Sequence, residues 1–340
     1  MLADLTINPK KIEISIRVDE NNKIGSGHIN RCIALASILK DKFEVVFYIY
    51  SASMISLNTI KKDFNLVIIE NNNNFISQID AYRIVILDGY HFTSSLQKKI
   101  KQKNCLLVSI DERLNIQYFA DVIISYSPQI KSISFKKMKW TKCYLGFKYL
   151  FLKNDFLVES KKQKLIDSKL QKSVLISFGG ADKENLSTAV VKILLNLNII
   201  DSIFILVGPC NINSFHEFYS NSTVKLIYSA DARKIIKIAN KSLFAITSPS
   251  TIMLELFAVG LPIISGYSNK RQIDALNFLA QRGLLHSVGY FYNKNVASNL
   301  MNAIKLSLSN PSKYIKKQKL IFKNQERDIV SIFERLSCDL

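Results

Sequence analysis

Short apolar runs rich in Ile, Val and Leu recur along the first half of the chain, separated by more polar segments. Most of these runs are continuous rather than alternating, which is typical of parallel strands that are buried on both faces. Helix-period segments lie between them, and this alternation indicates α/β layers. The pattern predicts strands at 12–18, 43–50, 65–69, 83–88, 105–110 and 121–125, and helices that include 28–40 and 93–103.

A polar, lysine-rich stretch at 161–172 has the composition of a linker, and a second alternation begins after it. A charged amphipathic segment at 313–336 predicts one or two further helices at the end. The second alternation predicts strands at 173–178, 202–208, 223–228, 243–246 and 262–265, and helices at 183–197, 231–239, 250–259, 270–282 and 295–309.

Two α/β alternations in 340 residues predict two Rossmann-like lobes, each with a full core and with parallel sheets that face a central cleft. We expect an N-terminal lobe at 1–160, a C-terminal lobe at 170–310 and a helical segment at 311–340. In such sheets, ligands bind beyond the carboxyl ends of the strands. The residues that follow each strand are therefore the first candidates for a site.

The chain carries 46 Lys and Arg against 27 Asp and Glu, a net charge of +19. Such a charge favours anionic partners: nucleotides, nucleic acid or an acidic membrane surface. The lysines are spread, with small clusters at 98–103, 136–139 and 313–319, and the aromatic residues do not interleave with a basic groove. We expect most of this charge to be solvated surface and no nucleic-acid partner.

No apolar run reaches the roughly 18 residues that a membrane span requires. The first residues lack the apolar core and cleavage site of a signal peptide. We therefore expect a cytoplasmic protein without stable membrane insertion, and a monomer as the default. The sequence also shows no aromatic or apolar amphipathic patch of the kind that peripheral transferases use.

The cysteines are odd in number and widely spaced, which fits neither a disulfide framework nor a zinc site. The four histidines are equally scattered, without the spacing of metal ligands. We expect reduced thiols and no metal or other cofactor. The cysteines are Cys32, Cys105, Cys143, Cys210 and Cys338, and the histidines are His28, His91, His216 and His286.

The segment from Ile24 to Arg31 reads Ile-Gly-Ser-Gly-His-Ile-Asn-Arg, between a predicted strand and a predicted helix. Gly25 and Gly27 allow a ligand to approach the main chain, and the first turn of the helix attracts anions. The positive end of the helix disfavours an imidazolium, so a neutral His28 can act as a general base. The alternative is a glycine turn with a histidine at the helix start, and the spacing leaves both open.

The same glycines raise the possibility of a dinucleotide-binding fingerprint. That fingerprint needs a third small residue where Asn30 stands, and an acidic residue at the end of the second strand. The second predicted strand ends in Tyr50-Ser51 instead, with Glu44 at its beginning. We therefore do not expect NAD or FAD.

Polar residues follow two more strands of the first half. Asp88 and Tyr90 follow one strand and Asp111 follows the next. Two carboxylates and a tyrosine at one sheet edge can orient a histidine or a sugar. The alternative is that each aspartate caps the following helix, an explanation that is stronger for either residue alone than for the pair.

In the second half, Gly179, Gly180 and Asp182 lie between a strand and a helix, where small residues let backbone N–H groups reach a phosphate. Ser250 and Thr251 begin another helix, and their hydroxyls can hold a diphosphate. Glu255 lies one turn further, where its carboxylate can accept hydrogen bonds from ribose hydroxyls or remain a surface glutamate. The segment from Asn269 to Gln272 opens a further helix toward the same edge.

These motifs, in this order and over almost the whole chain, resemble the GT-B superfamily of nucleotide-sugar enzymes. More narrowly, they resemble the family of UDP-sugar hydrolases of pseudaminic acid biosynthesis, relatives of the transferase MurG. The combination of Arg17-Val18-Asp19 with the segment Ile24 to Arg31 is specific. The other matching motifs are shared more widely or are shorter: 88–90, 109–112, 146–150 with Phe156, 178–182 with 185–187, and 250–255.

The resemblance implies a reaction in which His28 activates water against the anomeric carbon and UDP leaves with inversion. The family's substrate is UDP-2,4-diacetamido-2,4,6-trideoxy-β-L-altropyranose, and no metal is needed. On the sugar side the resemblance implies Arg17, Asp19, Asp88, Tyr90 and Tyr149, beside Gly25 and Gly27. On the nucleotide side it implies Gly179, Gly180, Ser250 and Thr251 at the diphosphate, Glu255 at the ribose, and Asn269 and Gln272 at phosphate or sugar.

The chain departs from the family pattern where His91 follows Tyr90, where Glu112 replaces a common aspartate, and where Lys270-Arg271 separates Asn269 from Gln272. These changes touch the sugar and phosphate pockets, so they bear on the exact sugar more than on the fold. Three functions stay open: a UDP-sugar hydrolase, a glycosyltransferase of the same fold, and a non-catalytic nucleotide-sugar-binding protein.

Overall fold

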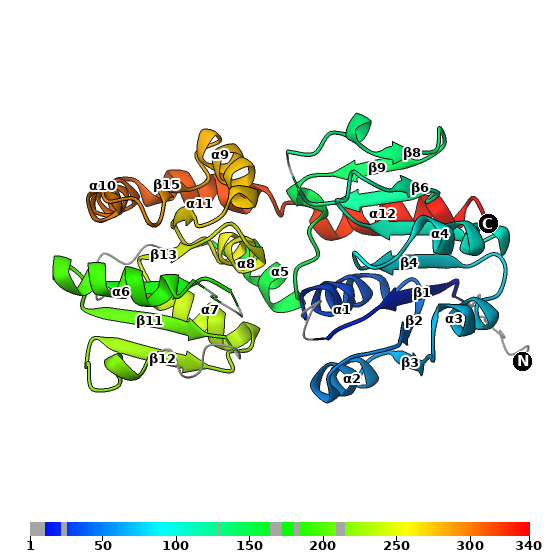
Figure 1. Cartoon of the computed structure of the whole chain (residues 1–340), viewed down its shortest axis with the longest axis horizontal. Coiled ribbons are helices and arrows are strands. Elements are labelled where there is room, and N and C mark those ends of the chain that lie inside the picture. Colours follow the sequence, from blue (N-terminus) through cyan, green and yellow to red (C-terminus); the bar gives the residue numbers. More distant parts are fainter. Residues whose placement is uncertain are drawn as a thin grey trace, which may run out of the picture. The chain divides into compact units, whose positions relative to one another are not determined.

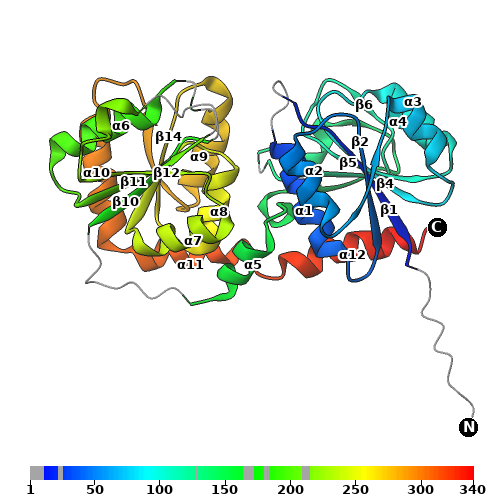
Figure 2. The same cartoon turned by 90° about the horizontal axis from the view of Figure 1, so that it is seen from below.

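The computed structural model of the chain describes residues 11–21, 26–127, 129–163, 172–179, 182, 184–208 and 215–340. The chain forms two compact units. The first contains residues up to Lys153 together with Asn324–Leu340, and the second is Asn154–Lys323. Both are built on parallel sheets, as predicted (Figures 1 and 2).

The first unit has a seven-stranded parallel sheet in the order β3-β2-β1-β4-β5-β7-β9. Its strands are β1 (Glu13–Val18), β2 (Glu44–Ile49), β3 (Asn65–Ile68), β4 (Ile84–Asp88), β5 (Leu106–Ile110), β7 (Val122–Ser125) and β9 (Lys142–Leu145). A separate short parallel pair is formed by β6 (Gln117–Tyr118) and β8 (Lys136–Lys137). Its helices are α1 (Gly27–Leu39), α2 (Met54–Lys61), α3 (Asn72–Gln78), α4 (Ser94–Gln102) and α12 (Gln325–Ser337), with the 3₁₀ turns η1 (Ser132–Ser134) and η2 (Phe147–Tyr149).

Successive side chains of the central strands enter two different cores, one on each face of this sheet. Ile84 and Ile86 pack into a core with α1 and α12, whereas Val85 and Leu87 pack into a core with α3 and α4. Because side chains alternate across a strand, a continuous apolar run is what two covered faces require. This is why the apolar runs located the strands.

The second unit has a six-stranded parallel sheet in the order β12-β11-β10-β13-β14-β15. Its strands are β10 (Ser173–Ser177), β11 (Ser202–Val207), β12 (Val224–Tyr228), β13 (Phe244–Thr247), β14 (Ile263–Tyr267) and β15 (His286–Tyr290). Its helices are α5 (Asn154–Lys161), α6 (Leu186–Leu197), α7 (Ala232–Lys241), α8 (Thr251–Val259), α9 (Ile273–Gln281), α10 (Val296–Ser309) and α11 (Pro311–Leu320), with η4 (His216–Phe218) and η5 (Lys270–Gln272).

Helix α8 shows how local sequence sets an element boundary. It ends at Gly260, which adopts the left-handed conformation with φ of 76°. A side chain is strained there, and the added Cβ would also meet Lys319 and Ile315 of α11. Glycine therefore both ends the helix and lets α11 pack against it.

The end of the chain is divided between the units, where the sequence suggested one separate helical segment at 311–340. Helix α11 packs on α8 in the second unit, whereas α12 packs on α1 and η2 in the first. The boundary between the units falls at Lys153–Asn154 rather than in the stretch 161–172. Residues 164–171 of that stretch lie outside the described residues.

Candidate functional site

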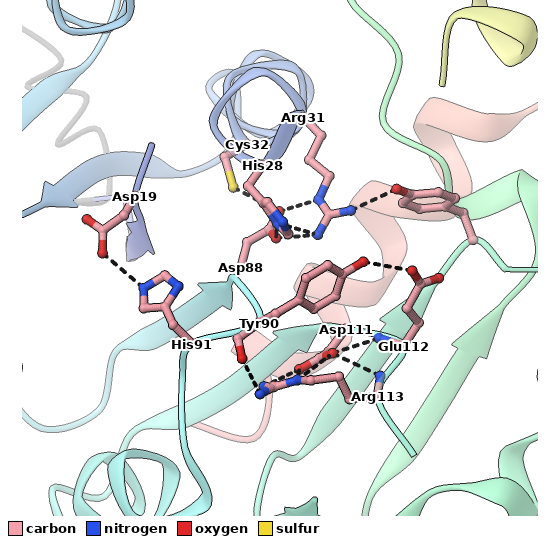
Figure 3. Close-up of polar contacts among 11 residues, drawn as sticks. Asp19, His28, Arg31, Cys32, Asp88, Tyr90, His91, Asp111, Glu112 and Arg113 are labelled. Atoms are coloured by element: carbon pink, nitrogen blue, oxygen red, sulfur yellow. Dashed lines mark hydrogen bonds and ion pairs between the residues drawn. The ribbon is translucent and has the colours of Figure 1, made fainter. Parts of the chain in front are cut away.

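The strand register of the first unit brings the ends of three strands together. Val18 of β1 pairs with Asp88 of β4, and Asp88 pairs with Ile110 of β5. Asp19 and Asp111, which directly follow β1 and β5, therefore lie at the same sheet edge as Asp88. This edge is also where α1 begins, with His28 in its first turn (Figure 3).

His28 and Asp88 form a buried pair at this edge. The ring nitrogen Nδ1 of His28 lies 2.6 Å from Oδ1 of Asp88, and the Asp88 side chain has no exposed surface. Nη2 of Arg31 lies 2.9 Å from the same Nδ1 and also donates to Oδ1 of Asp88. We assign the proton to Nδ1, because a carboxylate oxygen can only accept it and Arg31 then donates to that carboxylate. The other ring nitrogen, Nε2, is then an acceptor, and no residue in the described part of the chain bonds it.

Arg31 holds Asp88 from the other side. Its Nε donates to Oδ2 of Asp88 at 2.5 Å, and its Nη2 donates to Oδ1. Burial by itself raises the pKa of Asp88, but the Arg31 charge and its hydrogen bonds outweigh burial and leave that pKa below its ordinary value. Asp88 therefore stays ionised, and it fixes the tautomer and orientation of His28.

Tyr90 lies between this pair and a second acidic group (Figure 3). Its ring meets the His28 ring edge-on, with centroids 5.0 Å apart, and its hydroxyl donates to Glu112 at 2.7 Å. Burial and the Glu112 carboxylate raise the pKa of Tyr90, so the hydroxyl keeps its proton. Ser127 donates to the other oxygen of Glu112.

A small pocket, with room for about one water molecule, lies beside these groups. Arg31, which lines it, also donates to the hydroxyl of Tyr126 at 2.8 Å. The pocket therefore combines one cation, two carboxylates and several hydroxyls, a mixture that suits a polar molecule rich in hydrogen-bonding groups. Its lining residues are Arg31, Tyr90, Ile110, Asp111, Glu112, Ile124, Ser125 and Tyr126.

The buried residues Arg17 and Asp19 form a separate cluster with the more exposed His91. Arg17 donates to Asp19 at 2.6 Å, and Nε2 of His91 lies 3.0 Å from the other Asp19 oxygen. Asp19 also accepts the backbone N–H of Tyr50 at 2.8 Å. Burial raises the pKa of Asp19, but the hydrogen bonds from His91 and Arg17 together with the Arg17 charge bring it well below its ordinary value. In this structure Arg17 and Asp19 bond to one another and to the backbone.

Two other predicted residues of the first half, Tyr149 and Gly27, make no side-chain contact with this network in the described part of the chain. Tyr149 is buried in the core on the α1 face, where its ring packs edge-on against Tyr144. Gly27 begins α1, and a Cβ added there would meet nothing within 4 Å. Gly25 lies outside the described residues.

In the second unit, Gly179 and Asp182 follow β10. Gly179 has a φ of 86°, with open space where a Cβ would lie. The carboxylate of Asp182 accepts the backbone N–H groups of Leu186 at 2.9 Å and Ser187 at 3.0 Å. Asp182 therefore caps the first turn of α6. Gly180 lies outside the described residues.

Ser250 is the N-cap of α8, and its hydroxyl donates to the carbonyl of Ser248 at 3.1 Å instead of accepting from the helix. Thr251, the first residue of α8, is exposed, and Glu255 is half-buried one turn later. After β14, Gln272 accepts the backbone N–H of Ser268 at 2.9 Å, and Asn269 is exposed. These five residues follow two adjacent strands of one sheet.

Sequence reasoning did not give a role to Arg31 or Glu112, and it missed Tyr126. Arg31 lies three residues after His28, so the two share one face of a helix, and this spacing was readable. Tyr126 directly follows β7, so the rule that strand ends carry function would also have found it. No spacing in the sequence joins Glu112 to Tyr90, because that contact depends on the pairing of β4 with β5.

Across the described ranges, no three His, Cys, Asp or Glu residues are grouped as a metal site would require. No described helix has both the length and the apolar character to cross a membrane.

Comparison with solved structures defines the fold class. The chain superposes on MurG of Acinetobacter baumannii with a TM-score of 0.63 at 12% identity, covering 96% of this chain and 99% of that one. A glycosyltransferase of Rickettsia africae gives 0.65 at 12% identity, covering 96% and 98%. The Anabaena protein HepE, solved in complex with UDP-glucose, gives 0.62 at 11% identity, covering 97% and 100%. The chain therefore has the GT-B fold, as predicted.

Sequence comparison adds two relatives. The chain is 23% identical over 297 residues to the UDP-2,4-diacetamido-2,4,6-trideoxy-β-L-altropyranose hydrolase of Campylobacter jejuni, covering 83% of this chain and all of that protein. It is 27% identical over 277 residues to an uncharacterised protein of Methanocaldococcus jannaschii, covering 77% of this chain. That match spans only 57% of the archaeal protein. No family model matches the chain.

Proposed function

We propose that this protein hydrolyses a UDP-activated deoxyamino sugar, UDP-2,4-diacetamido-2,4,6-trideoxy-β-L-altropyranose or a close relative, in pseudaminic acid biosynthesis. The observation that carries the proposal is the buried group of His28, Asp88 and Arg31 at the strand ends. The similarity to the Campylobacter jejuni hydrolase over that protein's whole length supports it.

In the proposed reaction, Nε2 of His28 takes a proton from water as the water oxygen attacks the anomeric carbon. The bond between that carbon and the diphosphate oxygen breaks, and its electron pair leaves with UDP. A single displacement inverts the configuration at the anomeric carbon. Asp88 stabilises the imidazolium that forms, and the Arg31 charge keeps Asp88 ionised for this role.

We assign the sugar to the first unit, beside Tyr90, Asp88 and the pocket described above, with Arg17 and Asp19 holding the end of β1. We assign UDP to the second unit. There Gly179, Gly180, Ser250 and Thr251 would hold the diphosphate, Glu255 the ribose, and Asn269 and Gln272 a phosphate or the sugar. The N-terminus of α8, together with these hydroxyls, suits an anion.

The test is to incubate the protein with UDP-activated deoxyamino sugars in ¹⁸O-labelled water, with and without a sugar acceptor. We expect release of UDP without acceptor and one labelled oxygen in the free sugar, at its anomeric carbon. Label in UDP, or a product that first appears with retained configuration, would contradict the proposed displacement.

A glycosyltransferase is the second candidate, because the solved structures of the same fold include MurG and other glycosyltransferases. The same chemistry would then activate an acceptor hydroxyl instead of water. UDP release that depends strictly on an acceptor would favour the transferase. UDP binding without turnover in either condition would favour a non-catalytic binding protein.

A further inference from the structure

One segment of the first unit concentrates positive charge. Residues 131–142 contain five lysines, no arginine and no acidic residue, and we refer to them as the basic segment. They comprise the turn η1, the short strand β8 and the start of β9 (Figure 1). The lysines are Lys131, Lys136, Lys137, Lys139 and Lys142.

Two buried side chains attach the basic segment to the unit. Phe135 is buried and packs edge-on against the fully buried ring of Tyr118, with centroids 5.6 Å apart. Thr141 is buried and donates to the carbonyl of Ala120 at 2.7 Å. Strand β8 pairs with β6 between these two anchors. The segment is therefore a shaped part of the surface.

Most residues between and before these two anchors are exposed. Ile133 is 90% exposed and Trp140 is 54% exposed. Four of the five lysines are exposed, and no ion pair to any of the five occurs in the described part of the chain. An almost fully exposed isoleucine and a half-exposed tryptophan are thus surrounded by uncompensated charge.

We infer that the basic segment is a docking surface for an anionic lipid bilayer. Lysines are attracted to anionic headgroups, tryptophan favours the boundary between headgroups and acyl chains, and an exposed isoleucine gains by leaving water. A nucleic-acid surface would favour arginine and several stacking aromatic rings, which this segment lacks. The proposed contact is peripheral, so it is consistent with the expectation that the protein does not insert stably into a membrane.

This surface corrects the expectation that the chain carries no amphipathic patch. Ile133 and Trp140 lie seven residues apart, which is a helical spacing, but this stretch forms the turn η1 and the strand β8 instead of a helix, so that spacing does not identify a shared face. Strand β8 and the turn η1 bring them to the surface beside the lysines. Lys98 of α4 adds a further positive charge nearby, stacked over Phe119 directly after β6.

The chain supplies its own reporter, because Trp140 is its only tryptophan. The test titrates the protein with vesicles of phosphatidylcholine and phosphatidylglycerol in equal parts, and with vesicles of phosphatidylcholine alone. We expect the Trp140 emission to shift to shorter wavelength, and its quenching by iodide to fall, only with the anionic vesicles. Co-sedimentation gives the affinity.

Two variants and a matched control distinguish the effect of this surface on vesicle binding from the effect of the protein's net charge. Lys136→Glu with Lys137→Glu and Lys139→Glu is expected to weaken vesicle binding at least about 100-fold, from the loss of three lysines near the headgroups. Ile133→Ser is expected to weaken it several-fold with little change in salt dependence. The control reverses three exposed lysines of the second unit, Lys305, Lys313 and Lys316, and is expected to bind like the original protein.

Three outcomes would overturn the inference: no binding by the unaltered protein, equal binding to both kinds of vesicle, or equal loss in the two triple variants. An RNA or duplex DNA oligonucleotide that shifts Trp140 emission at lower concentration than the vesicles do would also overturn it. The inference does not depend on the proposed hydrolase activity, which the triple variants are expected to retain.

Discussion

Both units place polar groups at the carboxyl ends of their parallel strands, but the two sets of groups differ in kind. In the first unit a carboxylate at a strand end, Asp88, bonds two polar side chains of α1, His28 and Arg31. In the second unit the strand ends carry glycine, hydroxyls and an amide that bond nearby backbone, as with Ser250 and Gln272.

This difference indicates which chemical role each unit can have. Buried charges held by partners are already oriented, so they can handle a proton without rearrangement. Backbone N–H groups and hydroxyls at a helix start bind an anion without changing their own charge. We therefore expect substitutions in the first unit to act on turnover and substitutions in the second to act on UDP affinity.

The largest effect is expected from His28→Ala. Removal of a general base costs turnover on the order of 10³-fold, while UDP affinity stays within a factor of about two. UDP release in single-turnover experiments measures the first, and calorimetry the second. His216→Ala, at an exposed histidine of the second unit, is the control. Unchanged turnover in His28→Ala would remove the base from the mechanism.

Asp88→Asn is expected to lower turnover about 100-fold. The amide can donate to Nδ1 of His28 and so place the proton on Nε2, the wrong tautomer for a base. The control is Asp121→Asn, at a carboxylate that pairs with Lys101 in the same unit. If both variants lose turnover in proportion to lost thermal stability, Asp88 has only a structural role.

Asp19→Asn is expected to lower the free energy of unfolding at pH 7 by about 3 kcal/mol, because Arg17 loses its buried partner. The pKa of Asp19 is lowered in the folded state, so its contribution is complete above the unfolded carboxyl pKa of about 3.9. That contribution disappears as the pH falls from there toward the folded pKa. In chemical denaturation from pH 7 to pH 3, the difference between the two proteins should stay constant down to about pH 4 and begin to shrink below it.

The control for that series is Asp41→Asn, at an exposed aspartate of the same unit. Its stability should follow that of the original protein at every pH. A difference between Asp19→Asn and the original protein that stays constant down to pH 3 would show that the charge of Asp19 is not the cause.

The smallest effect is expected in the second unit. Glu255→Ala should weaken UDP binding by about 1.5–3 kcal/mol, the usual size of a lost charge-assisted hydrogen bond, with turnover of bound substrate nearly unchanged. Calorimetry with UDP measures it, and Glu217→Ala, at an exposed glutamate of the same unit, is the control. An unaltered affinity would take Glu255 out of the nucleotide site. A lower turnover of bound substrate in Glu255→Ala would contradict the expectation that substitutions in the second unit act on UDP affinity.

Most strands were predictable because burial on both faces of a sheet requires a continuous apolar run in the sequence. Elements that lack this signature were missed: α2, α3, α5, β6, β8, β9 and β15. Helix α3 begins Asn-Asn-Asn, residues with low helix propensity, and depends on the side chain of Asn71 as its cap. Strand β15 is an edge strand that contains Gly289 and is only partly buried.

For the candidate site, the sequence predicted which positions follow the strands, but it did not predict which side chains contact one another. That Asp88 would bond His28 rather than a sugar depends on the geometry of α1 above β4, which no local pattern contains. Arg17 and Asp19 were likewise placed at the sugar, whereas the structure shows what they bond at the end of β1. Their roles toward a substrate stay predictions.

The placement of α12 has a consequence for synthesis of the protein. The first unit needs residues from both ends of its sequence, since Ile329, Ile332 and Phe333 are buried in the core beside α1. The second unit is synthesised before α12. Until α12 follows, the α1 face of the first sheet lacks part of its cover. This exposed apolar surface would make the nascent first unit a candidate for chaperone binding and would make late truncations more damaging than their length suggests.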